Sequence, residues 1–173
     1  MAGGVAAFPI TDGADKPARS PAKGTPMPEF YPEHIPETAD PFLKGYLAAF
    51  EWLLPDEQDG DRPDAIDRSK IRGWSREALR RIKADCRDFQ RANKAALARY
   101  CELRRAETAH RLRVRQYDEL ECAGHDFFLT RERHGTGFWD RGEDPVFEEL
   151  TKAAETYGEA GHPWLHRGWL RLD

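Results

Sequence analysis

Apolar side chains recur at helical spacing in two stretches of the first two thirds of the chain. The first stretch, 41–54, follows Asp40, an N-cap residue with proline directly behind it, and ends before another proline. The second begins after Ser75 as one apolar stripe that is interrupted at Asn93. We therefore expect a helix over 41–54 and one long helix from 75 that ends, bends or protrudes between 104 and 116.

The last third of the chain has a different pattern, in which short β-like runs alternate with glycines. HDFFLT at 125–130 and FWD at 138–140 flank RERHGTG, which predicts a hairpin with His134 at its tip. A helix should follow from Asp144-Pro145, and a second hairpin should form around Arg167-Gly168. The predicted fold class is α+β: N-terminal helices, including one long basic helix, pack on a small antiparallel sheet of two β-hairpins flanking a helix (ββαββ).

The start of the chain is rich in proline, because 1–41 holds eight of the twelve prolines. Each proline removes a backbone donor and disfavours helix in the residue before it. We therefore assign 1–39 to a disordered or extended tail and 40–173 to a single α+β domain. Phe30, Tyr31 and Ile35 could lie extended against the domain, so the order of 26–40 stays open.

The composition narrows the class of protein. The chain has 173 residues, of which 34% are charged, 39% are hydrophobic and 11% are aromatic. This composition supplies enough apolar residues for one hydrophobic core and a strongly charged surface. No apolar run approaches the roughly 18 residues of a membrane span, and the N-terminus lacks the pattern of a secretory signal. Three cysteines without a CxxC pair argue against a disulfide framework or a thiolate zinc site. We expect a cytoplasmic protein that does not bind membranes.

Positive charge is concentrated in 76–115, where thirteen Lys or Arg outnumber five acids, giving +8 in a chain of net charge −4. Six of these cations step by three or four residues, so on a helix they form one ridge away from the apolar stripe. This basic ridge is either a surface for phosphates or an acidic partner, or a solvated helix face paired with Glu77, Asp85 and the acidic loop 56–67. It consists of Arg76, Arg80, Lys83, Arg87, Arg91 and Lys94.

Polar and aromatic residues are densest in AGHDFFLTRERHGTGFWDRG, 123–142, which is the main candidate site. The cluster is compatible with a divalent metal on His125, Asp126 and Asp140, with proton transfer by a His–Asp pair, or with salt bridges that shape a hairpin for recognition. The metal pattern is weak because no HxH or HxxxH accompanies it, and no serine lies in a GxSxG setting. Cys122 is close to His125 in sequence, and we interpret it as a small buried cysteine. We expect no catalytic residue, metal or cofactor, and a binding hairpin made of His125, Asp126, Arg131, His134, Trp139, Asp140 and Arg141.

The run GHDFFLTRERHGTGFWDRG resembles a motif, roughly GHDFWLTRNGHGxGFWDR, of a family of small proteins from bacteriophages, prophages and other mobile elements. YLAAFEW at 46–52, WSREALRRIKADCRDFQRAN at 74–93 and LTKAAETYGEA at 150–160 fit the same family, so the resemblance covers about 40–160. Glu132-Arg133 stands where the family has an Asn-Gly turn, and His166-Arg167-Gly168 replaces its closing Gly-Asp-Asp-Gly turn. The resemblance implies a genomic setting in a bacterial host cell, and no reaction.

We therefore expect a non-enzymatic accessory protein of a phage or mobile element that binds a macromolecular partner, foremost a protein. An inhibitor of a host defence complex, of the anti-CRISPR or antirestriction type, would be one such protein. One alternative is a small metal-dependent hydrolase centred on His125, Asp126, His134 and Asp140. Another is a nucleic-acid-binding protein that uses the basic helix 76–94. The partner and the oligomeric state stay open.

Overall fold

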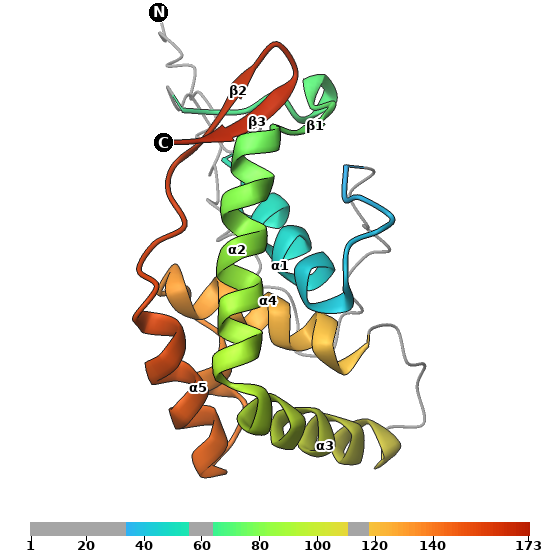
Figure 1. Ribbon diagram of the computed structural model, residues 1–173, viewed down its shortest axis with the longest axis vertical. Helices are drawn as coiled ribbons and strands as arrows, with labels where there is room; N and C mark the ends of the chain where they lie inside the picture. The colour runs from blue at the N-terminus through green and yellow to red at the C-terminus, as the bar shows by residue number, and fades with distance from the viewer. Residues whose placement is uncertain (1–33, 56–63, 111–117) are drawn as a thin grey trace, which may run out of the picture.

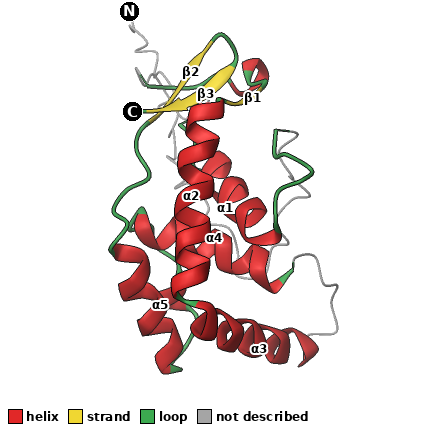
Figure 2. Ribbon diagram, in the orientation of Figure 1, coloured by secondary structure: helices red, strands yellow, loops and turns green. Residues whose placement is uncertain are grey.

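The computed structural model describes residues 34–55, 64–110 and 118–173. Helices and a small sheet share this part of the chain, which confirms the predicted α+β fold class (Figure 2). Within the described residues, no helix is long and apolar enough to cross a membrane. The elements are α1 (Pro41–Trp52), a 3-10 turn (Arg68–Lys70), β1 (Gly73–Trp74), α2 (Arg76–Ala92), α3 (Lys94–His110), α4 (Glu119–Arg131), a second 3-10 turn (Phe138–Asp140), α5 (Pro145–Glu155), β2 (Pro163–His166) and β3 (Trp169–Leu172).

Three helices begin at the caps that the sequence predicts. The Asp40 carboxylate accepts the N–H of Leu43 at 3.1 Å at the start of α1. The Ser75 hydroxyl accepts the N–H of Ala78 at 3.2 Å before α2, and the Asp144 carboxylate accepts the N–H of Val146 at 3.1 Å before α5. Each cap satisfies a backbone donor that the first turn of a helix leaves unpaired.

The predicted long helix is two helices, because α2 ends at Ala92 and α3 starts at Lys94. The Asn93 side chain donates to the Phe89 carbonyl at 2.9 Å and so competes with the continuing backbone ladder. In Figure 1 α3 turns sharply away from α2 at this point. α3 ends at His110, within the predicted range 104–116, but the break at Asn93 divides the predicted single helix in two.

The predicted hairpin over 125–140 is wrong, because HDFFLT forms the second half of helix α4 and FWD forms a 3-10 turn. Asp118 caps α4 and Glu121 completes a capping box, so the helix starts well before the motif. Five of the six residues of HDFFLT are buried, His125 being half-buried, and a short buried run does not distinguish a strand from a helix. The ββ half of the predicted ββαββ arrangement is thus replaced by a helix and a turn.

The second predicted hairpin is confirmed. β2 pairs antiparallel with β3 through a turn at Arg167 and Gly168, whose φ angles are 52° and 86°. Positive φ at both central residues is the geometry that joins two twisted strands with two residues. β1 adds a parallel partner to β3, which gives a mixed sheet of order β1-β3-β2 at the N-terminal end of α2 (Figure 1). With two residues, β1 is too short to produce an alternating pattern in the sequence.

Helices α1 and α4 cross in direct backbone contact at two glycines. A Cβ atom on Gly45 would lie 1.8 Å from the carbonyl oxygen of Glu121, and one on Gly124 would lie 1.8 Å from that of Phe42. The close crossing brings aromatic rings of both helices together with those of α2. Phe127 stacks on Phe89 with ring centroids 4.1 Å apart, and Phe128 stacks on Phe50 at 4.6 Å.

Residues 34–39, part of the predicted tail, pack against the domain. Ala39 is buried, Ile35 lies against the core, and the His34 ring nitrogen Nε2 is 2.8 Å from the Ile71 carbonyl oxygen. The remainder of the predicted tail, 1–33, lies outside the described residues, as does most of the acidic loop 56–67.

Candidate functional site

Asp126, in the middle of α4, is completely buried and forms an ion pair with Arg141. Its carboxylate accepts two hydrogen bonds from the Arg141 guanidinium, of which the Nε bond is 2.6 Å long, and one from the Tyr100 hydroxyl at 2.7 Å. Burial by itself raises the pKa of this carboxyl, but the hydrogen bonds, above all those from Arg141, outweigh it and hold the pKa below its ordinary value. Asp126 is therefore an ionised, saturated acceptor that ties α4 to α3 and to the segment after the second 3-10 turn.

Arg131, at the end of α4, is buried as well and ties this helix to α1, α2 and the chain after α5. Its guanidinium donates to the Asp85 carboxylate at 3.0 Å and to the Tyr46 hydroxyl at 2.9 Å. It also donates to the backbone carbonyl oxygen of Gly158 at 2.8 Å and lies 5.5 Å from the centre of the Phe127 ring. Every direction in which an arginine donates is thus occupied inside the protein.

Thr130 and Gly137 close the loop between α4 and the 3-10 turn. The Thr130 hydroxyl accepts the buried N–H of Phe138 at 3.0 Å. A Cβ atom on Gly137 would lie 2.4 Å from the same hydroxyl, so the loop can approach only because residue 137 has no side chain. We call the set Tyr100, Asp126, Thr130, Arg131, Gly137 and Arg141 the motif brace.

The other predicted binding residues of the motif do not converge on one another. His125 is a quarter exposed, with Nδ1 3.9 Å from Asp126, and the His134 ring packs edge-on against Trp52 with centroids 5.8 Å apart. Asp140 is exposed and accepts a hydrogen bond from Thr136 at 3.2 Å, while half of Trp139 is exposed. Among the described residues, no group of three or more His, Cys, Asp or Glu is placed to hold a metal ion. The four ligands of the metal-site alternative are thus dispersed.

Burial raises the pKa of all three cysteine thiols. The thiol of Cys101 has its pKa raised to about 11, mainly by burial and then by Glu119, and those of Cys86 and Cys122 are raised for the same main reason. A thiol with a raised pKa is protonated at neutral pH and is a poor nucleophile. Cys122, interpreted from the sequence as a small buried cysteine, is half-buried and packs against the core.

One buried carboxylate was missed by the sequence analysis. Glu51 on α1 is 4% exposed, and Trp74 Nε1 donates to its Oε1 at 2.7 Å, while His34 Nδ1 lies 3.7 Å from its Oε2. Burial raises the pKa of Glu51, against the opposing hydrogen bond from Trp74. The signal was present in the sequence, because Glu51 comes four residues after Leu47 on the buried stripe of the helix.

The basic ridge of α2 borders a groove between α2 and the start of α1. The floor is apolar, with Leu43 and Cys86 buried and Leu79 half-buried, and the hollow has a volume of about 530 Å³. Arg91 and Lys94 lie beyond it, and Arg91 pairs with Asp88 at 2.9 Å. We call this hollow the basic groove; it is lined by Thr38, Ala39, Asp40, Leu43, Arg76, Leu79, Arg80, Lys83, Cys86 and Arg87.

The four cations of the basic groove have no carboxylate partner in the described part of the chain. The one carboxylate of the groove, Asp40, is occupied as the cap of α1. Asp85, expected to pair within α2, binds Arg131 instead. Elsewhere in the described residues several cations do pair with carboxylates, as Arg99 does with Asp144 at 3.0 Å. The groove therefore carries an excess of positive charge over an apolar floor.

Comparison of the chain with family models, with curated proteins and with solved structures found no match. The resemblance of 124–142 to proteins of phages and mobile elements stays a prediction.

Proposed function

We propose that the protein is a non-enzymatic accessory protein that binds an anionic segment of a macromolecular partner in the basic groove. The observation that carries the proposal is the row of four cations, Arg76, Arg80, Lys83 and Arg87, that line one groove without a carboxylate partner among the described residues. A row of like charges raises the free energy of the folded chain through mutual repulsion, and a bound polyanion relieves that repulsion.

The motif brace supports the same proposal, because its charged groups are engaged inside the protein and hold the helices that form the basic groove. The charged groups that are prominent in the sequence are used inside the protein: Asp126 binds Arg141, and Arg131 binds groups of α1 and α2. They position α1, α2 and α4, and thereby the two walls of the basic groove. The motif resemblance would place the partner in a bacterial cell that hosts a phage or mobile element.

The test is a titration of the full-length protein with two labelled polyanions, poly-L-glutamate and a short DNA duplex, followed by fluorescence anisotropy. The double reversal Arg80→Glu/Arg87→Glu should weaken binding of at least one probe by more than about 10-fold, because two attractions become repulsions. For the duplex, Arg80→Ala and Arg87→Ala should each lower the slope of log affinity against log salt concentration by about 1.

Arg105→Ala is the matched control, since Arg105 is an exposed arginine of α3 that already pairs with Glu119. It should leave both affinities and both salt slopes unchanged. Equal affinity of the wild type and of the double reversal for both probes would rule out the basic groove as a binding surface.

A further inference from the structure

The outer face of the sheet carries a row of aromatic and cationic side chains. In the β2–β3 pair, Trp164 lies opposite Arg171 and His166 lies opposite Trp169. Residues that are opposite across a pair or two apart along a strand share a face, so these four side chains line one surface, which we call the sheet face. The other surface of the hairpin carries Leu165 and Leu170 and packs against the core.

Both tryptophan rings of the sheet face are exposed and held in place. Trp164 is 40% and Trp169 is 46% exposed. The Arg171 guanidinium lies 5.4 Å from the centre of the Trp164 ring, and the His166 ring meets it edge-on at 5.8 Å. Trp169 rests on Gly73 of β1, where a Cβ atom would lie 3.3 Å from the indole ring. A flat ring that is fixed from one side and open on the other can stack on a planar ligand.

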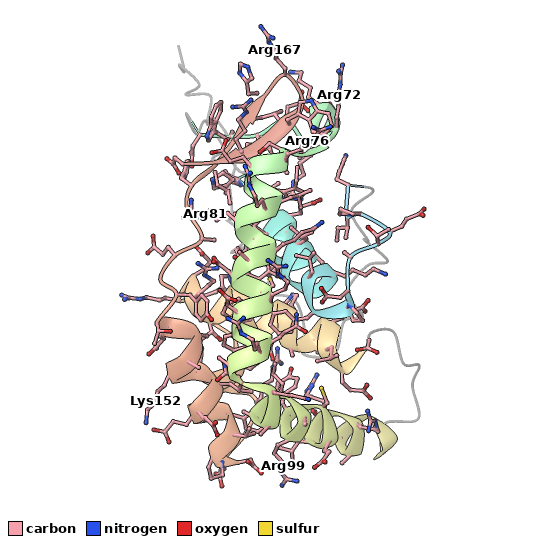
Figure 3. The ribbon with its side chains drawn as sticks, viewed as in Figure 1. Arg72, Arg76, Arg81, Arg99, Lys152 and Arg167 are labelled. Carbon is pink, nitrogen blue, oxygen red and sulfur yellow. The ribbon has the colours of Figure 1, made fainter. Side chains whose placement is uncertain are left out.

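The surroundings of the two rings are positively charged. Arg171 is on the sheet face, Arg167 is in the turn, and Arg72 lies against Gly168. Figure 3 shows Arg72 and Arg167 at the same end of the molecule as Arg76, the first cation of the basic groove. The nearest carboxylate along β3, that of Asp173, accepts the N–H of His162 at 2.8 Å.

We infer that the sheet face binds single-stranded nucleic acid, with two bases stacked on Trp164 and Trp169 and the phosphates attracted by Arg72, Arg167 and Arg171. Flat aromatic faces combined with flanking cations match the two features of such a strand, unstacked bases and a charged backbone. An apolar ligand would not interact with the cations, and an acidic peptide would not stack on the two fixed indole rings. The inference rests on the proposed function, because it identifies the anionic partner and extends its path from the groove to the sheet.

The experiment measures binding of the full-length protein to a fluorescein-labelled oligothymidylate of about 12 nucleotides, a length within the range that one small binding domain covers. Trp164→Ala and Trp169→Ala should each weaken binding of the single strand by about 5- to 100-fold, the range of one lost base–aromatic stack. Trp164→Phe should retain most of the affinity, because phenylalanine keeps a stacking surface. A duplex of the same length should bind more weakly than the single strand, since its bases are already stacked.

Trp52→Ala is the matched control, because Trp52 is 49% exposed but lies on α1, outside the sheet. It should bind the single strand as the wild type does, and circular dichroism should show that every variant is folded.

Three results would overturn the inference: wild-type affinity in both tryptophan-to-alanine variants, equal affinity for duplex and single strand, or binding of a proline-rich peptide in place of the oligonucleotide. If the tryptophan variants bind normally while Arg80→Glu/Arg87→Glu does not, the groove stands without the stacking surface. If that double reversal also leaves the affinities for the oligonucleotide, the duplex and poly-L-glutamate unchanged, the proposed function fails as well.

Discussion

Removing the Asp126 carboxylate should be among the most destabilising single changes in this protein. Asp126 is fully buried, so Asp126→Ala leaves the Tyr100 hydroxyl and the Arg141 guanidinium without an acceptor and with no solvent to replace it at the Asp126 position. Breaking a buried ion pair by removing one partner costs about 3–5 kcal/mol, against a total free energy of unfolding of about 5–15 kcal/mol. In a chain of this size, each kcal/mol lowers the midpoint of thermal unfolding by about 2–4 °C.

Urea unfolding followed by far-ultraviolet circular dichroism should measure the loss, with Asp126→Ala, Arg141→Ala and the double variant forming a cycle. The double variant should be less destabilised than the sum of the single ones, by about 1–3 kcal/mol, because removing both partners leaves no unpaired charge. Asp140→Ala serves as the control: this aspartate belongs to the same motif but is exposed, so its removal should change stability by less than about 0.5 kcal/mol.

The reasoning would be refuted if Asp126→Ala cost no more than Asp140→Ala. It would also be refuted if the two single changes at Asp126 and Arg141 were strictly additive, because then the carboxylate and the guanidinium would not stabilise the fold through each other.

Three further predictions concern other contacts of the fold. Gly124→Ala should destabilise the protein by about 1–3 kcal/mol although alanine favours helix, because its Cβ would lie 1.8 Å from the Phe42 carbonyl oxygen. The control Gly135→Ala places its Cβ in open space and should leave stability unchanged. Wild-type stability of Gly124→Ala in urea unfolding would contradict the close crossing of α1 and α4. Thr130→Val should cost about 1–3 kcal/mol by leaving the buried N–H of Phe138 unpaired, and unchanged thermal stability would argue against that bond. The raised pKa of Glu51 means that the folded state holds this proton more tightly than the unfolded state, so the stabilisation is complete below the unfolded pKa and is lost as pH rises through the folded pKa. Glu51→Gln should therefore gain stability relative to the wild type as pH rises from about 4 towards neutrality, and a difference that is independent of pH would contradict the shift.

The parts of the fold that could be predicted are those that local sequence determines. A cap followed by proline marks a helix start wherever it occurs, and both Asp40-Pro41 and Asp144-Pro145 begin helices. The turn at Arg167-Gly168 could also be predicted, because glycine tolerates the positive φ that a two-residue hairpin needs. The α+β class followed from these elements.

The parts that failed depend on tertiary contacts. Because α4 is enclosed by α1, α3 and α5, HDFFLT lacks a solvent-facing polar side. It therefore does not show the helical spacing of apolar and polar residues that would identify a helix. The partners of Asp126 and Arg131 come from segments that are 15 to 85 residues distant in sequence, and a single sequence gives no distance between them. Predicting the cluster as structural was compatible with this outcome, but the predicted hairpin was the wrong structure for it.

The basic ridge could be predicted from the sequence only in part. Its spacing correctly placed five of the six cations on the outer side of α2, while Lys94 begins α3. The groove exists only because α1 packs beside α2. The sheet face was invisible at the level of the sequence for a similar reason: Trp164 and Trp169 share a surface with Arg171 only once the register of the hairpin is known.

The most direct test of the whole account measures two quantities, the free energy of unfolding and the affinity for the single-stranded oligothymidylate, on the same two variants. Asp126→Asn should unfold more easily but bind with wild-type affinity while it is folded. Arg80→Glu/Arg87→Glu should unfold no more easily than the wild type, because it removes repulsion within the basic groove, but should bind the oligonucleotide more than about 10-fold more weakly. The reverse outcome, with binding lost in folded Asp126→Asn and retained in the double reversal, would contradict the division between a motif that builds the fold and a cationic surface that binds.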